Sequence, residues 1–436
     1  MSGSYNLSKF EDNFCGGRFW DFSRLWDFEQ PDFTGCFQKT VFSWVPLAVI
    51  LFFTLFEVPG YFSSRNKNRN IRLNWYNALK LILTLSLAAV NIGQIICVGM
   101  VDGDDDLSTR EVFLADYLFG ASYLLSHILS FCLLLLSLKF GVRASYTQFI
   151  FYLVSSVCEA TVFRSMILRD ETSSTVIDGE LYLMGCQLGF GAVMLFLNFW
   201  ADCAPRITDE SLKDISNLCP ESAASIPSKL TFFWVATIIW KGFRNTLDTA
   251  MLWTLPPSIT SSGVVPIFDS FFAPSVEAAK KIDRLNKKAE NRESKDIKKT
   301  KVSVFPALLK TFGYEFFLGS FFQALYSVLI VVGPPQIQSK IIEYVEYSAY
   351  FDGKGEYLWK AYYFAGLLFA TNILISICNG QYFNKMYVIS MKLRTALNSS
   401  IYRKAVKLSS TARKESTVGE IVNLMSVDVQ RFMVSF

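Results

Sequence analysis

The sequence is poor in charge and lacks a segment that would hold a nucleotide phosphate. Only 18% of its 436 residues are charged, against about a quarter in an average soluble domain. Lys and Arg number 42 and Asp and Glu 38, so the formal net charge is +4, too small to favour a nucleic-acid partner. No G-x-x-x-x-G-K-[ST] segment occurs. We therefore expect no catalytic, cofactor or metal site in this chain, and no ATP binding or hydrolysis by the chain alone.

We expect no cleavable leader at the beginning of the sequence. Residues 1–40 are polar and slightly acidic, and no short apolar run precedes a cleavage site of small residues. The first apolar run is therefore expected to act as its own uncleaved insertion signal.

Apolar residues are abundant and gathered into long runs. Hydrophobic residues make up 51% and aromatic residues 16% of the sequence, which fits poorly with an ordinary soluble enzyme, a disordered regulator or a fibrous protein. A membrane-spanning helix needs about 20 mainly apolar residues. The runs that meet this length are residues 41–62, 78–100, 112–138, 145–168, 179–201, 315–335 and 358–381. They predict an all-α polytopic membrane protein, with the sixth span ending at Pro334-Pro335.

The charge of the connections predicts the orientation of these spans. The basic connections are residues 63–77, 139–143, the second half of 202–312, and 384–436, and those poor in base are 1–40, 101–111, 169–180 and 336–357. The two kinds alternate along the chain, and basic loops stay in the cytoplasm. We expect the N-terminus outside and the C-terminus inside, which an odd number of spans allows.

Two cysteines and one asparagine lie in the N-terminal segment that is expected outside, where they can be modified. Cys15 and Cys36 both lie in residues 1–40, where a disulfide can persist. The sequence favours such a bond, and two unpaired thiols are the alternative. Asn6 opens the sequon Asn-Leu-Ser and is a candidate for N-glycosylation.

A long connection, residues 202–312, separates five spans from the last two. Its part 229–255 has an apolar core too short to span, flanked by bases, which favours a helix lying in the headgroup layer. The residues expected at that interface are Phe232, Trp234, Trp240 and Lys241. A buried helix of a small soluble domain is the alternative. Residues 280–301 hold ten Lys/Arg and four Asp/Glu, a net charge of +6, and are read as a mobile solvated linker.

Placing an ionisable side chain inside a membrane-spanning segment costs free energy, so such residues usually have a structural or functional role. They are Glu57, Asp116, His127, Glu159 and Arg164. Contacts between helices are the favoured role. A proton relay is the alternative, but it would need more such groups at the depth of the membrane centre.

The segment after the seventh run keeps a helical spacing of apolar residues and predicts a helix that continues beyond the membrane. Thr417 and Glu420 then form the pattern of a capping box that opens a second, amphipathic helix. Such a helix offers a docking surface for a cytoplasmic partner, and a solvated helix pair is the alternative.

Several segments together resemble one family, the multidrug resistance-associated exporters of ABC transporter subfamily C. The segments are PDFTGCFQKTVFSWVP, LCPESAASIPSKLTFFWVATIIWKGFRNTL, LLKTFGYEFF, VVGPPQI and STARKESTVGEIVNLMSVDVQRFM. The resemblance covers the whole chain, and the set of motifs is specific even though each segment alone is short.

The resemblance implies a domain organisation and a partner. Residues 1–40 would be the extracellular segment, 41–201 a five-span accessory domain, 202–312 a cytoplasmic linker with a lasso helix at 229–255, and 313–436 the start of a type 1 transmembrane domain. The first intracellular loop would couple to a nucleotide-binding domain through Thr417, Glu420, Leu424, Ser426 and Asp428. ATP and Mg²⁺ would be held by nucleotide-binding domains that this sequence lacks. The plasma membrane is the expected location, and a vacuolar or lysosomal membrane is the alternative.

Two departures from the family pattern stand out. The sequence stops inside the first intracellular loop and ends on Val434-Ser435-Phe436, so we expect a truncated product or a fragment that does not transport by itself. The sixth run carries Phe316, Phe322, Gln323, Tyr326 and Ser327 where the resemblance implies the substrate cavity. These residues supply aromatic surface and hydrogen bonds but no positive charge.

Three functions follow from these observations. The first is the N-terminal part of an ATP-driven exporter of amphipathic or organic anionic compounds, such as xenobiotics and conjugates. The second is a regulatory membrane subunit that holds a partner channel or transporter through its five-helix domain. The third is a secondary transporter, which we rank last because the sequence shows neither inverted repeats nor helices broken at the membrane centre.

Overall fold

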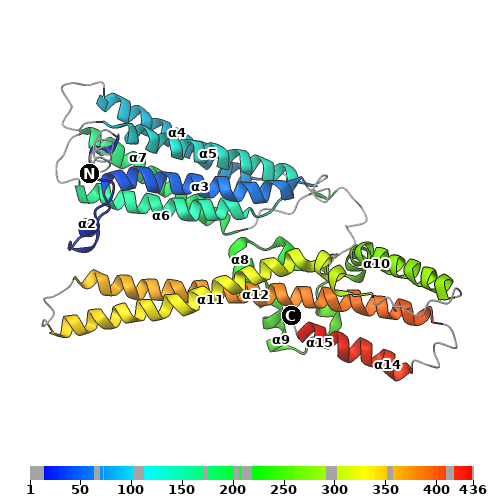
Figure 1. The fold of residues 1–436 in the computed structure, drawn as a ribbon. Helices are drawn as coiled ribbons and strands as arrows, with labels where there is room; N and C mark the ends of the chain where they lie inside the picture. Colours follow the sequence, from blue (N-terminus) through cyan, green and yellow to red (C-terminus); the bar gives the residue numbers. More distant parts are fainter. Residues whose placement is uncertain are drawn as a thin grey trace. The chain divides into compact units, whose positions relative to one another are not determined.

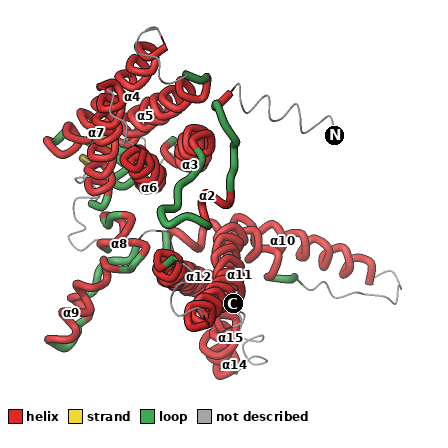
Figure 2. The backbone as a smooth tube through the Cα atoms, turned by 90° about the vertical axis from the view of Figure 1, so that its left-hand side faces the viewer, coloured by secondary structure: helices red, strands yellow, loops and turns green. Residues whose placement is uncertain are grey.

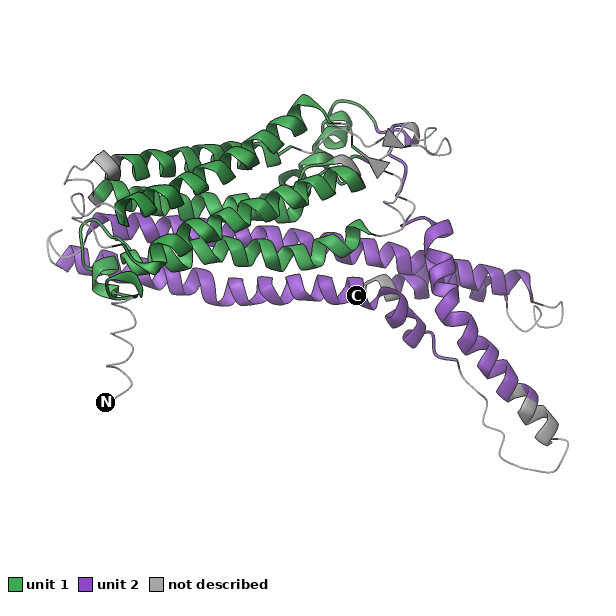
Figure 3. Cartoon of the chain, turned by 90° about the horizontal axis from the view of Figure 1, so that it is seen from above, with its two compact units in different colours: residues 1–216, 220–246 green, residues 217–219, 247–436 purple. Residues whose placement is uncertain are grey.

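The protein is almost entirely helical (Figure 1, Figure 2). A computed structural model describes residues 14–62, 69–71, 73–102, 112–169, 175–200, 206–207, 219–256, 258–290, 302–350, 357–408 and 417–434. The chain divides into two compact units (Figure 3). Unit 1 holds residues 1–216 and 220–246, and unit 2 holds residues 217–219 and 247–436.

Seven of the described helices are long and apolar enough to cross a membrane. They are α3 (Gly35–Tyr61), α4 (Trp75–Asp102), α5 (Leu114–Phe140), α6 (Tyr146–Arg169), α7 (Thr175–Asn198), α11 (Phe305–Tyr350) and α12 (Leu358–Val406). Each of the seven apolar runs falls on one of these helices. The predicted all-α polytopic membrane fold is therefore confirmed.

Unit 1 is a bundle of the five helices α3 to α7. Helix α3 packs against α5 and α6, α4 packs against α5 and α7, and α6 packs against α7. The apolar core has buried side chains from each of these helices, namely Ile50, Leu87, Leu133, Phe151, Tyr152 and Met194. A two-residue antiparallel ladder, β1 (Arg69–Asn70) with β2 (Arg206–Ile207), joins two connections of this unit. The sequence pattern gave no indication of the ladder, because two residues are too few for a strand period.

The lasso segment is not one helix, so the predicted helix over 229–255 is wrong. The structure has η3 (Pro220–Ala223), α8 (Ile226–Leu230), η4 (Phe233–Val235) and α9 (Ala236–Arg244). Phe232 adopts a left-handed backbone conformation, with φ 57°, between α8 and η4. An α-helix cannot pass through that conformation. Helix α9 then ends at Asn245, whose backbone is extended.

Unit 2 is built around the long antiparallel pair α11 and α12. A further helix, α10 (Ser261–Glu290), packs against both of them. Beyond α12 the chain forms α14 (Val418–Asn423), the π-helical turn η6 (Leu424–Asp428) and α15 (Val429–Val434). Both η6 and α15 contact α12. A short helix, η5 (Thr249–Met251), precedes α10.

The prediction that the sixth span ends at Pro334-Pro335 is wrong, because helix α11 continues through this pair to Tyr350. Helix α12 continues past the seventh apolar run to Val406, which confirms the predicted helical continuation. Hydropathy marks only the apolar part of a helix, whereas the helix continues for as long as its residues favour it. Proline is tolerated inside membrane helices because neighbouring groups satisfy the freed carbonyls.

The reading of residues 280–301 as a mobile linker is wrong for residues 280–290, which form the last turns of α10. This stretch holds four Lys together with Arg284, Leu285, Ala289 and Glu290, all residues with high intrinsic helix propensity. Residues 291–301 lie outside the described residues.

Candidate functional site

Helix α10 docks on the α11–α12 pair through an apolar cluster. Phe268 of α10 is fully buried, and Val264 is 3% exposed. The cluster is completed by Ala307, Leu308 and Phe312 of α11 and by Met386, Ile389, Leu393 and Ala396 of α12. Because Phe and Val lie one helical turn apart on α10, a single face of that helix is buried. The cluster therefore fixes α10 against the base of the pair.

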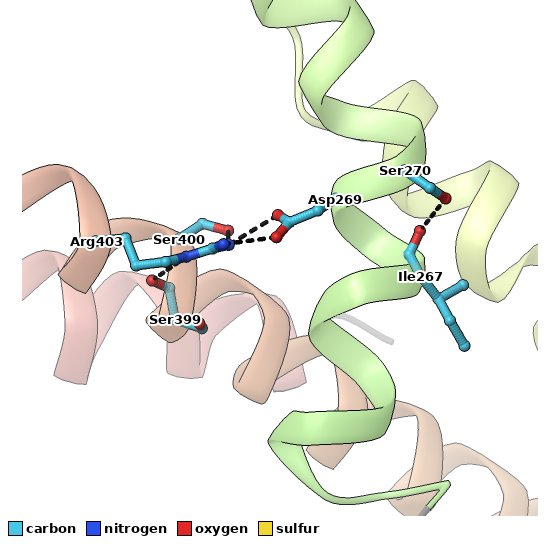
Figure 4. Close-up of polar contacts among 6 residues, drawn as sticks. All are labelled: Ile267, Asp269, Ser270, Ser399, Ser400 and Arg403. Atoms are coloured by element: carbon cyan, nitrogen blue, oxygen red, sulfur yellow. Dashed lines mark hydrogen bonds and ion pairs between the residues drawn. The ribbon is translucent and has the colours of Figure 1, made fainter.

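An ion pair also joins α10 to α12 (Figure 4). The Arg403 guanidinium of α12 donates two hydrogen bonds to the Asp269 carboxylate, 2.6 Å from Nη1 to Oδ2 and 2.7 Å from Nη2 to Oδ1. Such a bidentate arrangement fixes the orientation of both side chains. Arg403 also donates from Nε to the Ser399 carbonyl and from Nη2 to the Ser400 hydroxyl. The pair joins residues 134 positions apart in the sequence.

A second ion pair joins α11 and α12 directly. The Lys392 ammonium lies 2.6 Å and 2.8 Å from the two carboxylate oxygens of Glu315. The side chain of Lys392 is 11% exposed and that of Glu315 is 41% exposed. A lysine this buried needs a partner, so the pair holds the two helices in one register. Sequence reasoning missed both ion pairs, since neither pairing is visible from spacing along one helix.

The coupling segment, residues 417–434, begins with the capping box that the sequence predicts. The Glu420 amide donates to Thr417 Oγ1, and the Thr417 amide donates to a Glu420 carboxylate oxygen. Ser426 donates its hydroxyl to the Val422 carbonyl, and Asp428 is exposed.

One side of the coupling segment packs on α12 while the other is open. Val429 is 3% exposed, whereas Val418 is 71%, Val422 53%, Leu424 46% and Val427 44% exposed. Exposed apolar side chains that lie together on one element are typical of an interaction surface.

The residues of α11 expected at a substrate cavity do not share one environment. Phe316 packs against the apolar cluster that holds α10. Phe322, Gln323 and Tyr326 are half-buried, and Ser327 is exposed. The side-chain oxygen of Gln323 is buried and has no hydrogen-bond partner among the described residues.

The lasso residues present apolar side chains outward, mainly from α9. Phe243 is 82%, Ile239 65% and Trp240 57% exposed. The Arg244 guanidinium lies 5.0 Å from the centre of the Trp240 ring. Lys241 is exposed as well, while Phe232 and Trp234 are half-buried. This combination of bases and outward apolar side chains is typical of a helix at a membrane surface.

Lys229 shows how the lasso is attached to the rest of unit 1. Its ammonium lies 5.9 Å from the ring centre of Tyr146 at the start of α6. Burial lowers the pKa of Lys229, and the nearby Glu221 carboxylate opposes that effect. Ile226, three residues earlier, is 2% exposed, so α8 is anchored by apolar packing too.

The N-terminal segment is tied to the beginning of α3. A disulfide joins Cys15 to Cys36, and both side chains pack against the buried Ala115 of α5. Thr34 donates its hydroxyl to the Phe19 carbonyl. Asn6, the candidate glycosylation site, lies outside the described residues.

The ionisable residues within the five-helix bundle contact neighbouring elements, as expected. A Glu57 oxygen accepts a hydrogen bond from the Thr147 amide at 2.9 Å. Asp116 pairs with Lys39 at 2.5 Å, and Glu159 accepts from Gln187 at 3.0 Å. Arg164 donates to the Pro31 carbonyl at 2.7 Å. His127 is buried among the rings of Tyr123, Phe151 and Tyr152.

Among the residues that the structure describes, no group of three or more His, Cys, Asp or Glu side chains is placed to hold a metal ion.

Comparison with known proteins gives relatives but no matching family model. ATP-binding cassette sub-family C member 3 of Mus musculus is 28% identical over 436 residues, which is 96% of this chain and 27% of that protein. Member 2 of Rattus norvegicus is 28% identical over 97% of this chain, and member 3 of Homo sapiens is 28% identical over 96%. The chain spans little more than a quarter of the length of these relatives. Over nearly its whole length, the chain resembles the N-terminal part of a multidrug resistance-associated protein-like ABC exporter of subfamily C.

Proposed function

We propose that this chain is the N-terminal part of an ATP-driven exporter, and that a nucleotide-binding domain docks on its coupling segment. In such a protein the nucleotide-binding domains hold ATP and Mg²⁺, and their movement is passed to the membrane helices through the coupling segment. The chain by itself does not transport.

The observation that carries this proposal is the coupling segment. Its elements η6 and α15 contact α12, Val429 is buried, and Val418, Leu424 and Val427 are exposed. A force applied to this surface would pass into α12, which runs without interruption from Leu358 to Val406. The similarity to sub-family C members over 96–97% of the chain supports the same assignment.

The exporter would move amphipathic or organic anionic compounds, such as xenobiotics and their conjugates. Gln323 and Tyr326 supply hydrogen-bonding groups on α11, and Phe322 supplies aromatic surface. Because none of these is basic, hydrogen bonding and apolar contact would dominate recognition over charge.

The protein would lie in the plasma membrane with its N-terminus outside and its coupling segment in the cytoplasm. The alternation of basic and acidic connections supports this orientation. A disulfide between Cys15 and Cys36 fits an oxidising compartment on the N-terminal side.

Photo-crosslinking in native membranes tests the proposal. A benzoylphenylalanine placed at Leu424 should crosslink to a peptide of a domain that contains a Walker A segment. Tyr350 is the matched control, because it is 84% exposed and lies at the other end of the α11–α12 pair, where α11 ends (Figure 1). Equal crosslinking from both positions, or none to a nucleotide-binding domain, would contradict the docking.

A transport assay tests the substrate class. Inside-out vesicles that contain the native gene product should take up carboxyfluorescein with ATP and Mg²⁺, and not with a non-hydrolysable ATP analogue. Uptake that does not depend on ATP hydrolysis would refute an ATP-driven exporter.

A further inference from the structure

Aromatic side chains are concentrated in the segment that precedes α3. Residues 14–34 hold seven Phe and Trp residues among 21, one third of the segment, whereas aromatic residues make up 16% of the whole chain. Several of these rings are open to the surroundings, since Phe22 is 59% and Trp20 45% exposed. Large exposed aromatic side chains that lie close together in a segment are typical of an interaction surface.

The segment is attached to α3 and α6 at several points. The disulfide between Cys15 and Cys36 fixes its beginning to α3. Near its end, the Gln38 amide of α3 donates to the Asp32 carboxylate at 3.0 Å, and the Ser165 hydroxyl of α6 donates to the other oxygen of that carboxylate at 2.8 Å. The exposed rings therefore have a defined position at the end of the bundle where α3 begins.

The contacts with α3 give the depth of these rings relative to the membrane. The Trp20 ring lies 4.9 Å from the Phe37 ring and the Phe19 ring lies 5.7 Å from it, both measured between centroids. Phe37 precedes Val41, where the first apolar run begins, by four residues, which is about 6 Å along an α-helix. The head-group layer on each side of the hydrocarbon core is about 5–8 Å thick. Trp20 therefore lies at the depth of the head groups.

Helix α6 gives a similar depth from a different contact. Ser165, which donates to Asp32, lies three residues before Leu168 at the end of the fourth apolar run, about 4–5 Å along the helix. Because a serine side chain is short, Asp32 lies beside α6 and not beyond its end. Both helices thus place the attachments of the segment within about 6 Å of the edge of the hydrocarbon core.

Helix α2 (Phe22–Trp26) lies in the middle of this segment, at the end of the bundle where α3 begins (Figure 1). It has five residues, and none of them is buried. A helix this short is not stable in water by its own hydrogen bonds. The rings of Phe22 and Trp26 are one helical turn apart and stack with their centroids 6.1 Å from each other. An apolar layer against this aromatic face would stabilise the helix.

The charges of the segment favour a lipid without net charge. Residues 14–34 have a net charge of −2, from the acids Asp21, Asp27, Glu29 and Asp32 and the bases Arg18 and Arg24. An anionic lipid surface attracts basic segments, not acidic ones. Trp, in contrast, is favourable in the head-group layer because its ring is amphipathic.

We propose that residues 19–26 lie on the bilayer surface, with the Trp20 and Phe22 side chains among the head groups of a zwitterionic phospholipid. The segment before α3 then anchors one end of the five-helix bundle to the lipid beside it. The proposal does not depend on transport or on nucleotide binding.

Photo-crosslinking of the full chain in nanodiscs of phosphatidylcholine tests the contact. Benzoylphenylalanine replaces Phe22 or Trp20, one at a time, and the mass of the intact chain is measured after illumination. Both variants should gain the mass of one phosphatidylcholine. Arg24 is the matched control, because it is exposed and lies about 200° round α2 from Phe22; the lipid adduct should be lost at this position.

The position of the segment is checked in each variant through the Cys15–Cys36 disulfide, by the mass of the unreduced chain. If the Phe22 variant loses the disulfide, the Trp20 variant decides the test. Equal lipid adducts at Phe22 and Arg24 would mean collision with lipid from every side and would overturn the proposal. Crosslinks from Phe22 and Trp20 to peptides of this chain, in place of lipid, would overturn it as well.

Nanodiscs with equal amounts of phosphatidylcholine and phosphatidylglycerol test the choice of lipid. The Phe22 variant should form more adduct with phosphatidylcholine, because the acidic segment repels the anionic head group. More adduct with phosphatidylglycerol would refute the preference for a zwitterionic lipid.

Discussion

Replacing Phe268 by alanine should release α10 from the α11–α12 pair. Phe268 is fully buried at the centre of the apolar cluster, and its ring lies 5.2 Å from that of Phe272, measured between centroids. Removing a buried phenyl ring costs about 3–5 kcal/mol. Because 1.4 kcal/mol corresponds to a factor of ten, the population in which α10 is undocked should rise by about a hundredfold or more.

Hydrogen–deuterium exchange of the solubilised chain measures this change. Amide exchange in residues 261–279 should become at least about a hundredfold faster in Phe268→Ala, up to the limit set by opening of the helix itself. Phe268→Leu keeps most of the apolar volume and should recover most of the protection. Phe271→Ala is the control, because Phe271 lies on the same helix and is 41% exposed.

Two results would refute the reasoning. The first is equal exchange in the Phe268 and Phe271 variants, which would mean that the apolar cluster does not hold α10. The second is faster exchange spread evenly over α11 and α12, which would mean that the substitution unfolds the whole unit.

Three smaller changes probe other contacts of unit 2. Asp269→Asn should weaken the docking of α10 by at most about 1 kcal/mol, because the ion pair of Asp269 with Arg403 is partly exposed. The loss should be smaller in high salt, which screens the ion pair. Hydrogen–deuterium exchange of α10 at two salt concentrations measures the loss and its salt dependence, and a loss that grows with salt would contradict the prediction. Gly333→Ala should destabilise the α11–α12 pair by about 1–3 kcal/mol, because the new Cβ would lie 2.6 Å from Thr371 Cγ2. The unfolding temperature measures this loss, and an unchanged value would show that the two helices can move apart freely. Thr417→Ala should destabilise the start of α14 by about 1 kcal/mol, and Thr417→Ser should not. Hydrogen–deuterium exchange of residues 418–423 measures the difference, and an equal loss of protection in the two variants would exclude a capping role.

The membrane helices could be predicted because length and hydropathy alone define them. All seven apolar runs coincide with helices, and the capping box at Thr417 follows from two residues at a fixed spacing. Helix α10 was missed because no single pattern covers it. Its first half is apolar and aromatic, its second half is basic, and it contains Pro266 and Pro274, which usually end a helix.

The polar contacts could not be predicted, because they join residues far apart in the sequence. Asp269 and Arg403 are 134 positions apart, and Gln94 and Gln187 are 93 apart. Each looks like an ordinary residue of its own helix. The break in the lasso depends on the left-handed backbone of Phe232, which no preference of phenylalanine predicts.

The most direct test of the central claim is the size of the protein in native membranes. An antibody against the N-terminal segment should detect a protein nearly four times as large as the 49.5 kDa of this chain, because the chain spans 27% of a sub-family C relative. Mass spectrometry of that band should find peptides of this chain together with a Walker A peptide. A band near 50 kDa alone, with no nucleotide-binding protein isolated alongside it, would contradict the assignment to an ATP-driven exporter.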